Sequence, residues 1–148
     1  MKRALWILLM FLPYQMMAQS EFTKSFNQGQ DADQKVFGTK AVGLYLKAEK
    51  KAKKSFEKNR VWKALADLYK DMSDYNYAAD YYTNLLAVYD ETNRKKVLLN
   101  LSDMWNMTGH YRKVIDNLKD MQDAPDEAVR LTNLSSAYTR LKKYDEIS

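Results

Sequence analysis

The sequence of 148 residues contains no cysteine, a single histidine, 4 glycines and 2 prolines. The absence of cysteine excludes disulfide bonds, thiolate metal sites and a cysteine nucleophile. The scarcity of glycine and proline disfavours a sheet with many tight turns and favours helices. With 46% hydrophobic and 29% charged residues, the chain can bury a core and is too apolar to be disordered. The sequence therefore predicts an all-α chain of one domain.

The residues that could carry catalysis are few and scattered. His110 lies between Gly109 and Tyr111, without the HExxH or paired-histidine spacing of a zinc site. Carboxylate pairs occur at Asp71/Asp74, Asp120/Asp123 and Asp126/Glu127, among others. These pairs fall at expected helix ends, where capping and turn formation explain them. The sequence also has no glycine-rich phosphate loop, so we expect no enzyme, no metal and no cofactor.

The only long apolar run lies at the N-terminus. Lys2 and Arg3 precede the apolar run Ala4–Leu12, Pro13 ends it, and Ala18 offers a small residue for cleavage. This layout predicts a cleavable secretory signal peptide over residues 1–18 and a periplasmic or extracellular protein. The alternative is a retained membrane anchor, but the run reaches only ~14 Å as a helix, against a ~30 Å hydrocarbon core.

Two segments follow the predicted signal peptide. Residues 19–35 are polar without a helical period, so we expect a flexible leader. Residues 36–58 show apolar residues at three- and four-residue spacing, which predicts a basic lead-in helix. Its apolar face comprises Ala41, Leu44, Tyr45, Ala48, Ala52 and Phe56. The basic patch on and after this helix comprises Lys47, Lys50, Lys51, Lys53, Lys54, Lys58 and Arg60.

The basic patch determines how charge is distributed. The net charge is +5, it falls to +3 without Lys2 and Arg3, and residues 47–63 alone carry +6. A basic amphipathic helix can bind an anionic membrane surface, a nucleic acid or an acidic protein. The simplest interpretation is a solvated face whose lysine stems cover the edge of the core. We expect no nucleic acid partner, because export is predicted and no base-reading motif is present.

Residues 61–86 carry the best-defined pattern in the chain. The first helical face comprises Trp62, Leu65, Ala66 and Tyr69, and a second face comprises Tyr75, Ala78, Tyr82, Leu85 and Leu86. The segment Met72-Ser73-Asp74, with its two small polar residues, predicts a turn between them. Ala66 and Ala78 are small enough to let two helices approach closely. The pattern predicts an antiparallel helix hairpin.

The same offsets return twice downstream. The second occurrence comprises Leu98, Leu101, Ser102, Trp105, Gly109, Tyr111, Val114 and Leu118. The third comprises Leu131, Leu134, Ser135, Tyr138, Tyr144 and Ile147. The first-helix aromatics Tyr69, Trp105 and Tyr138 are 36 and 33 residues apart, and so are the turn tyrosines Tyr75, Tyr111 and Tyr144.

This pattern resembles the tetratricopeptide repeat, which reads W-x2-L-G-x2-Y, then A-x3-F, then P, with a period of about 34 residues. Ala66 replaces the glycine, Tyr82 the phenylalanine and Asp90 the closing proline. The resemblance implies an antiparallel helix-hairpin solenoid of two and a half to three repeats over residues 59–148. The last repeat is expected to be incomplete, with Ser148 inside its second helix. The spacing Ala52-x3-Phe56 suggests a degenerate leading repeat.

The resemblance implies a scaffold that binds a protein or peptide through a concave groove of first helices. The groove residues would be Lys63, Asp67, Lys70, Lys96, Asn100, Asp103, Asn133, Ser136 and Arg140. Some members of the family bind the C-terminal carboxylate of their partner. This sequence matches their binding residues at Lys63 and Asn100 but not at Asp67, so we do not expect this chain to share their specificity. Two alternatives stay open: the N-terminal extracytoplasmic sensing region of a larger signalling or envelope protein, and an anionic membrane-surface binder using Lys47–Lys63.

Overall fold

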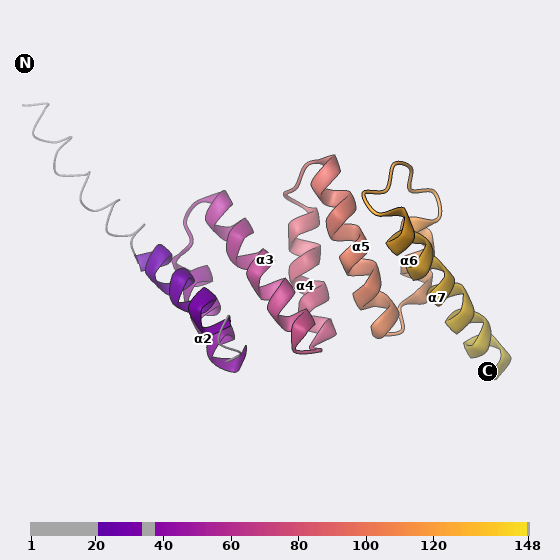
Figure 1. The fold of residues 1–148 in the computed structure, drawn as a ribbon, viewed down its shortest axis with the longest axis horizontal. Coiled ribbons are helices and arrows are strands. Elements are labelled where there is room, and N and C mark those ends of the chain that lie inside the picture. Colours follow the sequence, from indigo (N-terminus) through magenta and orange to yellow (C-terminus); the bar gives the residue numbers. More distant parts are fainter. Residues whose placement is uncertain (1–20, 34–37, 148) are drawn as a thin grey trace, which may run out of the picture. The chain divides into compact units, whose positions relative to one another are not determined.

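The computed structural model describes residues 21–33 and 38–147, in which every regular element is a helix (Figure 1). The all-α prediction is therefore confirmed for this part of the chain, whereas the predicted signal peptide lies outside it. After a helix over residues 21–33, the elements are α2 (Gly38–Lys51), α3 (Ser55–Asp71), α4 (Tyr75–Leu86), α5 (Glu91–Met107), α6 (Tyr111–Leu118) and α7 (Glu127–Ile147).

The chain forms two compact units that divide within α3, between Leu65 and Ala66. The first unit contains the helix over residues 21–33, α2 and most of α3. The second contains the last turns of α3 and the helices α4 to α7. Among the helices of the described ranges, none combines the length and the apolar character needed to cross a membrane.

The helix over residues 21–33 contradicts the prediction of a flexible leader there. Phe22 and Phe26 are buried one helical turn apart, and the Phe26 ring lies 5.5 Å from the Tyr45 ring on α2. Gly29 makes room for this contact, because a Cβ at that position would lie 2.6 Å from Tyr45 Cδ1. A few aromatic and small residues thus hold a helix whose remaining residues are polar, which explains why the sequence shows no clear period.

The predicted lead-in helix over residues 36–58 is also wrong in its extent. α2 ends at Lys51 and α3 begins at Ser55, earlier than the expected repeat start at residue 59. The side chain of Glu57 explains the break: its buried carboxylate accepts hydrogen bonds from the backbone N–H groups of Lys53 and Lys54, at 2.9 and 3.0 Å. These donors lie at the start of α3, where they lack partners within the helix.

The break also moves Phe56 away from the expected apolar face. Its side chain is 50% exposed, and the ammonium group of Lys54 lies 5.7 Å from the ring centroid. The buried residues of α2 are Ala41, Tyr45 and Ala48. The pair Ala52-x3-Phe56 therefore does not supply the inner face of a helix, since α2 ends before it.

In the second unit, α5 contacts α4, α6 and α7, and α6 also packs against α7 (Figure 1). The buried residues that join α5, α6 and α7 are Leu99, Val114, Leu118, Leu134 and Ala137. At the other end, the Tyr69 ring on α3 stacks on Tyr77 and Tyr81 of α4, at 5.1 and 5.9 Å. Helical periodicity thus buries one side of each helix against its neighbour in the chain.

Two similar turns shape this unit. In the turn after α3, Ser73 has φ 63°, and in the turn after α5, Gly109 has φ 82°. In each turn the next backbone N–H reaches back five residues, from Asp74 to the Tyr69 carbonyl and from His110 to the Trp105 carbonyl, both at 2.8 Å. A left-handed residue followed by this hydrogen bond is the Schellman type of helix end. The expected turn at residues 72–74 is confirmed.

The third expected hairpin does not form, because α7 runs without a break from Glu127 to Ile147. Tyr144, expected to begin a second helix after a turn, lies inside α7. The first two turns use a residue with positive φ, whereas Lys142 and Lys143 precede Tyr144. Lysine is a good helix former and has no preference for the left-handed conformation, so nothing local ends the helix there.

Candidate functional site

The predicted groove residues of the second unit lie on the last turns of α3, on α5 and on α7. The ammonium group of Lys70 donates to Oδ1 of Asn100 at 3.2 Å, which joins the last turn of α3 to the middle of α5. The Asn100 amide donates to the Lys96 carbonyl one turn earlier, at 3.3 Å. Asn100 is thus oriented from two directions, with its side chain half-buried.

Asp67 lies beside Lys70 in the chain and has a partner on α4. The hydroxyl of Tyr82, a residue only 1% exposed, donates to Oδ1 of Asp67 at 2.6 Å. Burial raises the pKa of Tyr82 far above its usual range, and the bond to Asp67 and the nearby carboxylates of Asp71 and Asp103 raise it further. The carboxylates of Asp67 and Asp71 on α3 and of Asp103 on α5 therefore act on the same hydroxyl group, that of Tyr82.

Asn133 is a correction to the expected set. Its side chain is 6% exposed, and its amide donates to the Leu99 carbonyl at 3.1 Å, while Asn106 donates to the Asn133 carbonyl at 2.9 Å. Asn133 therefore joins α7 to α5 inside the core and does not face a partner. Its polar type suggested a solvent-facing position, although a buried amide with satisfied donors packs stably.

Arg140 lies two turns further along α7 and reaches the Asn106 carbonyl on α5, at 3.5 Å. Ser136 is half-buried and Lys96 is exposed. Lys63 is exposed but belongs to the first unit, so the structure does not place it among these residues. We call the seven predicted residues that stay accessible in the second unit the polar face: Asp67, Lys70, Lys96, Asn100, Asp103, Ser136 and Arg140.

Residues of the basic patch, Lys51, Lys54 and Arg60 among them, have partners within the first unit. Lys51 forms an ion pair of 2.7 Å with Glu21. The hydrogen bond and charge of Lys51 lower the pKa of that carboxyl, with smaller contributions from Lys47 and Lys53. The Arg60 guanidinium lies 4.5 Å from the Phe26 ring centroid, and Lys54 contacts Phe56. Part of the patch therefore covers aromatic and acidic groups of its own unit.

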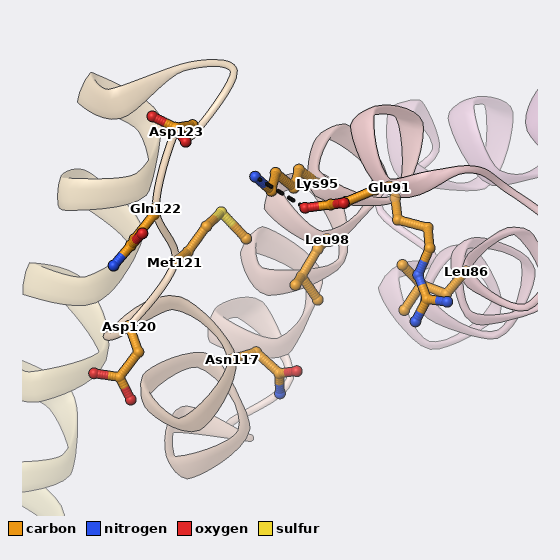
Figure 2. Close-up of a pocket in the computed structure, with 10 residues that line it drawn as sticks. Leu86, Glu91, Lys95, Leu98, Asn117, Asp120, Met121, Gln122 and Asp123 are labelled. Atoms are coloured by element: carbon orange, nitrogen blue, oxygen red, sulfur yellow. Dashed lines mark ion pairs between the residues drawn. The ribbon is translucent and has the colours of Figure 1, made fainter.

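A cleft of about 570 Å³ that sequence reasoning did not predict lies between the start of α5 and the segment after α6 (Figure 2). Leu86, Leu98 and Met121 line it with apolar surface, and the Glu91–Lys95 ion pair of 3.5 Å lies at its side. No local motif marks it, because its residues come from three helices and a loop. It could accept an apolar side chain of a partner.

The single histidine lies at another cleft, of about 430 Å³, between the start of α6 and the end of α7. His110 is exposed, and its Nδ1 lies 2.9 Å from the Thr108 hydroxyl. Asp145 contributes a carboxylate to the lining of this cleft. Within the described ranges, no three acidic or histidine side chains are grouped as a metal site would need.

Comparisons with known proteins add no family: no family model and no curated protein matches the sequence.

Proposed function

We propose that the chain is a tetratricopeptide-like helical-repeat scaffold that binds another protein or a peptide across the polar face. The hydrogen bond between Lys70 and Asn100 carries the proposal. These residues are 30 positions apart, and both were expected on the same side of consecutive first helices from the repeat register alone. A side-chain row that continues from α3 to α5 supports a face that contacts a partner with more than one helix.

The chemistry of the polar face suits a peptide backbone with flanking side chains. An asparagine amide can both donate to a carbonyl and accept from an N–H, so Asn100 matches a peptide group. The polar face carries both the carboxylates of Asp67 and Asp103 and the cations Lys70, Lys96 and Arg140. A face of mixed sign attracts neither a strong polyanion nor a polycation, so we expect binding that depends weakly on salt.

Export is part of the same proposal. The signal-like segment over residues 1–18 supports it, and the partner would then be met outside the cytoplasm.

The test uses peptides selected from a random library on the full chain, with two asparagine variants compared. Asn100→Ala removes the central amide of the polar face. Asn84→Ala is the matched control, because Asn84 is an exposed asparagine of α4 that belongs neither to the polar face nor to the lining of the two clefts. We expect Asn100→Ala to weaken binding of the selected peptides about tenfold or more and Asn84→Ala to leave it unchanged.

Two results would contradict the proposal. One is a set of selected peptides that binds both variants as tightly as the unchanged chain. The other is binding through the basic patch. If the chain is retained on anionic vesicles, and if either increased salt or the variants Lys47→Glu and Lys50→Glu abolish this retention, the membrane-surface alternative is favoured.

A further inference from the structure

The stacked tyrosines of the α3–α4 hairpin reach the surface of the second unit. The Tyr69 ring lies nearly parallel to the rings of Tyr77 and Tyr81, with interplanar angles of 27° and 10°. Tyr77 is 59% exposed, so one face of its ring lies against Tyr69 and the other is open to solvent. Because the stack orients the Tyr77 ring, a partner that packs on the open face does not have to order it.

Two carboxylates flank Tyr77 along α4. Asp74 precedes it by three positions and Asp80 follows it by three, and residues at this spacing are neighbours on a helix surface. Both are exposed, and the side chain of Asp74, the N-cap of α4, makes no capping hydrogen bond. In the described part of the chain, neither carboxylate has a hydrogen-bond or ion-pair partner. We call Tyr69, Tyr77, Tyr81, Asp74 and Asp80 the tyrosine surface.

The charge of this hairpin favours a cation. Residues 66–90 contain five aspartates, one lysine and no arginine, a net charge of −4. The face of an aromatic ring is also negative, because of its quadrupole. A cation over the open face of Tyr77 is therefore attracted both by the ring and by the carboxylates on either side of it.

Other accessible aromatic rings of this chain have a cation of their own. Lys54 lies 5.7 Å from the ring centroid of Phe56, which is 50% exposed, and Lys113 lies 5.8 Å from that of the half-buried Trp105. Among the described residues, no lysine or arginine lies over the ring of Tyr77. An exposed ring flanked by carboxylates thus receives no cation from its own chain.

We propose that the tyrosine surface binds an arginine side chain from an extended segment of another protein. A guanidinium is planar, so it can stack on the open face of Tyr77 while its edge donates hydrogen bonds to a carboxylate beside the ring. The compact ammonium of lysine cannot do both in one plane, so arginine is preferred. Asp67 of the polar face lies two positions, or about 200°, around α3 from Tyr69, so this site is independent of the polar face.

The probe is a fluorescent synthetic peptide of alternating arginine and glycine. Its binding to the full chain is measured by anisotropy at low salt. The same peptide with lysine in place of arginine has equal charge and length. Because each contact is exposed to solvent and contributes little, we expect the arginine peptide to bind about threefold or more tighter than the lysine peptide.

Paired variants of the full chain test the ring. Tyr77→Leu removes it and should weaken the arginine peptide about three- to fivefold, whereas Tyr77→Phe keeps the ring face and should bind it like the unchanged chain. Tyr138→Leu is the matched control and should have no effect. Tyr138 is 53% exposed, but Ser135 and Leu141 occupy the flanking positions where Tyr77 has aspartates.

A second pair of variants tests the carboxylates. Asp80→Asn removes one charge and keeps the size of the side chain, so it should weaken the arginine peptide about two- to threefold. Asp116→Asn is its control, because Asp116 is an exposed aspartate of α6 and its removal changes the net charge by the same amount. We expect Asp116→Asn to bind the arginine peptide like the unchanged chain.

The proposal is overturned if the arginine peptide does not bind, if the lysine peptide binds as tightly, or if Tyr77→Leu binds the arginine peptide like the unchanged chain. It is also overturned if Tyr138→Leu or Asp116→Asn weakens binding as much as the variant that it controls, since attraction would then be unspecific. Circular dichroism verifies the fold of each variant, and if Tyr77→Leu does not fold, Asp80→Asn and the lysine peptide still decide.

Two further measurements separate this site from the alternatives. If sedimentation shows that the unchanged chain is a dimer and that Tyr77→Leu makes it monomeric, a second copy occupies the surface and the proposal is wrong. Asn100→Ala should bind the arginine peptide normally, so this proposal and the one for the polar face can fail separately.

Discussion

The hydrogen bond between Tyr82 and Asp67 gives the sharpest prediction about stability. Tyr82→Phe keeps the buried ring and removes only the hydroxyl, which donates to Oδ1 of Asp67 at 2.6 Å. A hydrogen bond to a charged partner contributes about 1.5–3 kcal/mol. Because Asp67 is itself half-exposed, we expect Tyr82→Phe to lower the free energy of unfolding by about 1.5 kcal/mol near neutral pH.

The pH dependence of this loss follows from the raised pKa of Tyr82. Between the ordinary tyrosine pKa and the raised one, the unfolded chain has lost the phenolic proton while the folded chain still holds it. The contribution of the proton to stability is therefore complete below about pH 10 and declines as the pH rises further. One pH unit above the ordinary value of about 10, this decline amounts to about 1.4 kcal/mol.

Tyr82→Phe has no phenol at this position and cannot show that decline. We therefore expect the difference in stability between the unchanged chain and the variant to shrink from about 1.5 kcal/mol near pH 8 to almost nothing near pH 11. Urea unfolding followed by circular dichroism at both pH values measures it. Lysines and other tyrosines titrate in both proteins, so their effect cancels in the difference.

Tyr77→Phe is the control, because Tyr77 is 59% exposed. We expect it to change the free energy of unfolding by less than about 0.5 kcal/mol at either pH. A difference for Tyr82→Phe that stays constant or grows between the two pH values would refute the reasoning, since it would mean that the buried phenol does not keep its proton in the folded chain.

The remaining predictions concern helix ends, and the same urea unfolding near neutral pH checks them. Ser73→Gly should stabilise the chain by about 1 kcal/mol, and Gly109→Ala should destabilise it by about the same amount, because both positions have positive φ. A Cβ at Gly109 meets no atom within 4 Å, so only backbone strain acts there. Glu57→Ala should cost about 1–2 kcal/mol by removing the acceptor for two backbone donors, and an unchanged midpoint would contradict that role.

The hairpin of α3 and α4 was predictable because its signals are local. The spacing of apolar residues from Trp62 to Tyr69 repeats every three or four positions, and Met72-Ser73-Asp74 interrupts it. α3 ends at Asp71 and α4 begins at Tyr75, in agreement with that interruption. A strong period with a polar interruption specifies where a helix ends almost without reference to the rest of the chain.

The elements that were missed depend on contacts between segments. The helix over residues 21–33 is held by Phe22 and Phe26 against α2, and Gly29 is useful only because Tyr45 lies against it. The break before α3 depends on one side chain, Glu57, turning back to cap the backbone. A run rich in lysine and glutamate favours a continuous helix by propensity alone, so the break could not be read from composition.

In the candidate site, too, the sequence indicated the position of a residue in the repeat but not the groups that surround its side chain. Asn100 and Asn133 are asparagines on first helices, both predicted to face a partner, yet Asn100 bonds to an accessible lysine and Asn133 fills the core between α5 and α7. Residue type alone could not separate them, because an amide is equally satisfied by a carbonyl inside the protein and by a partner outside.

The opposite error occurs at Tyr138, and it is the more informative one. The repeat register assigned this aromatic residue to a core, and the structure leaves it 53% exposed. Tyr69 and Trp105 have the same position on their helices and differ only in having α4 and α6 beside them. The register therefore predicts which side of a helix is built for burial, whereas a neighbour decides whether burial occurs.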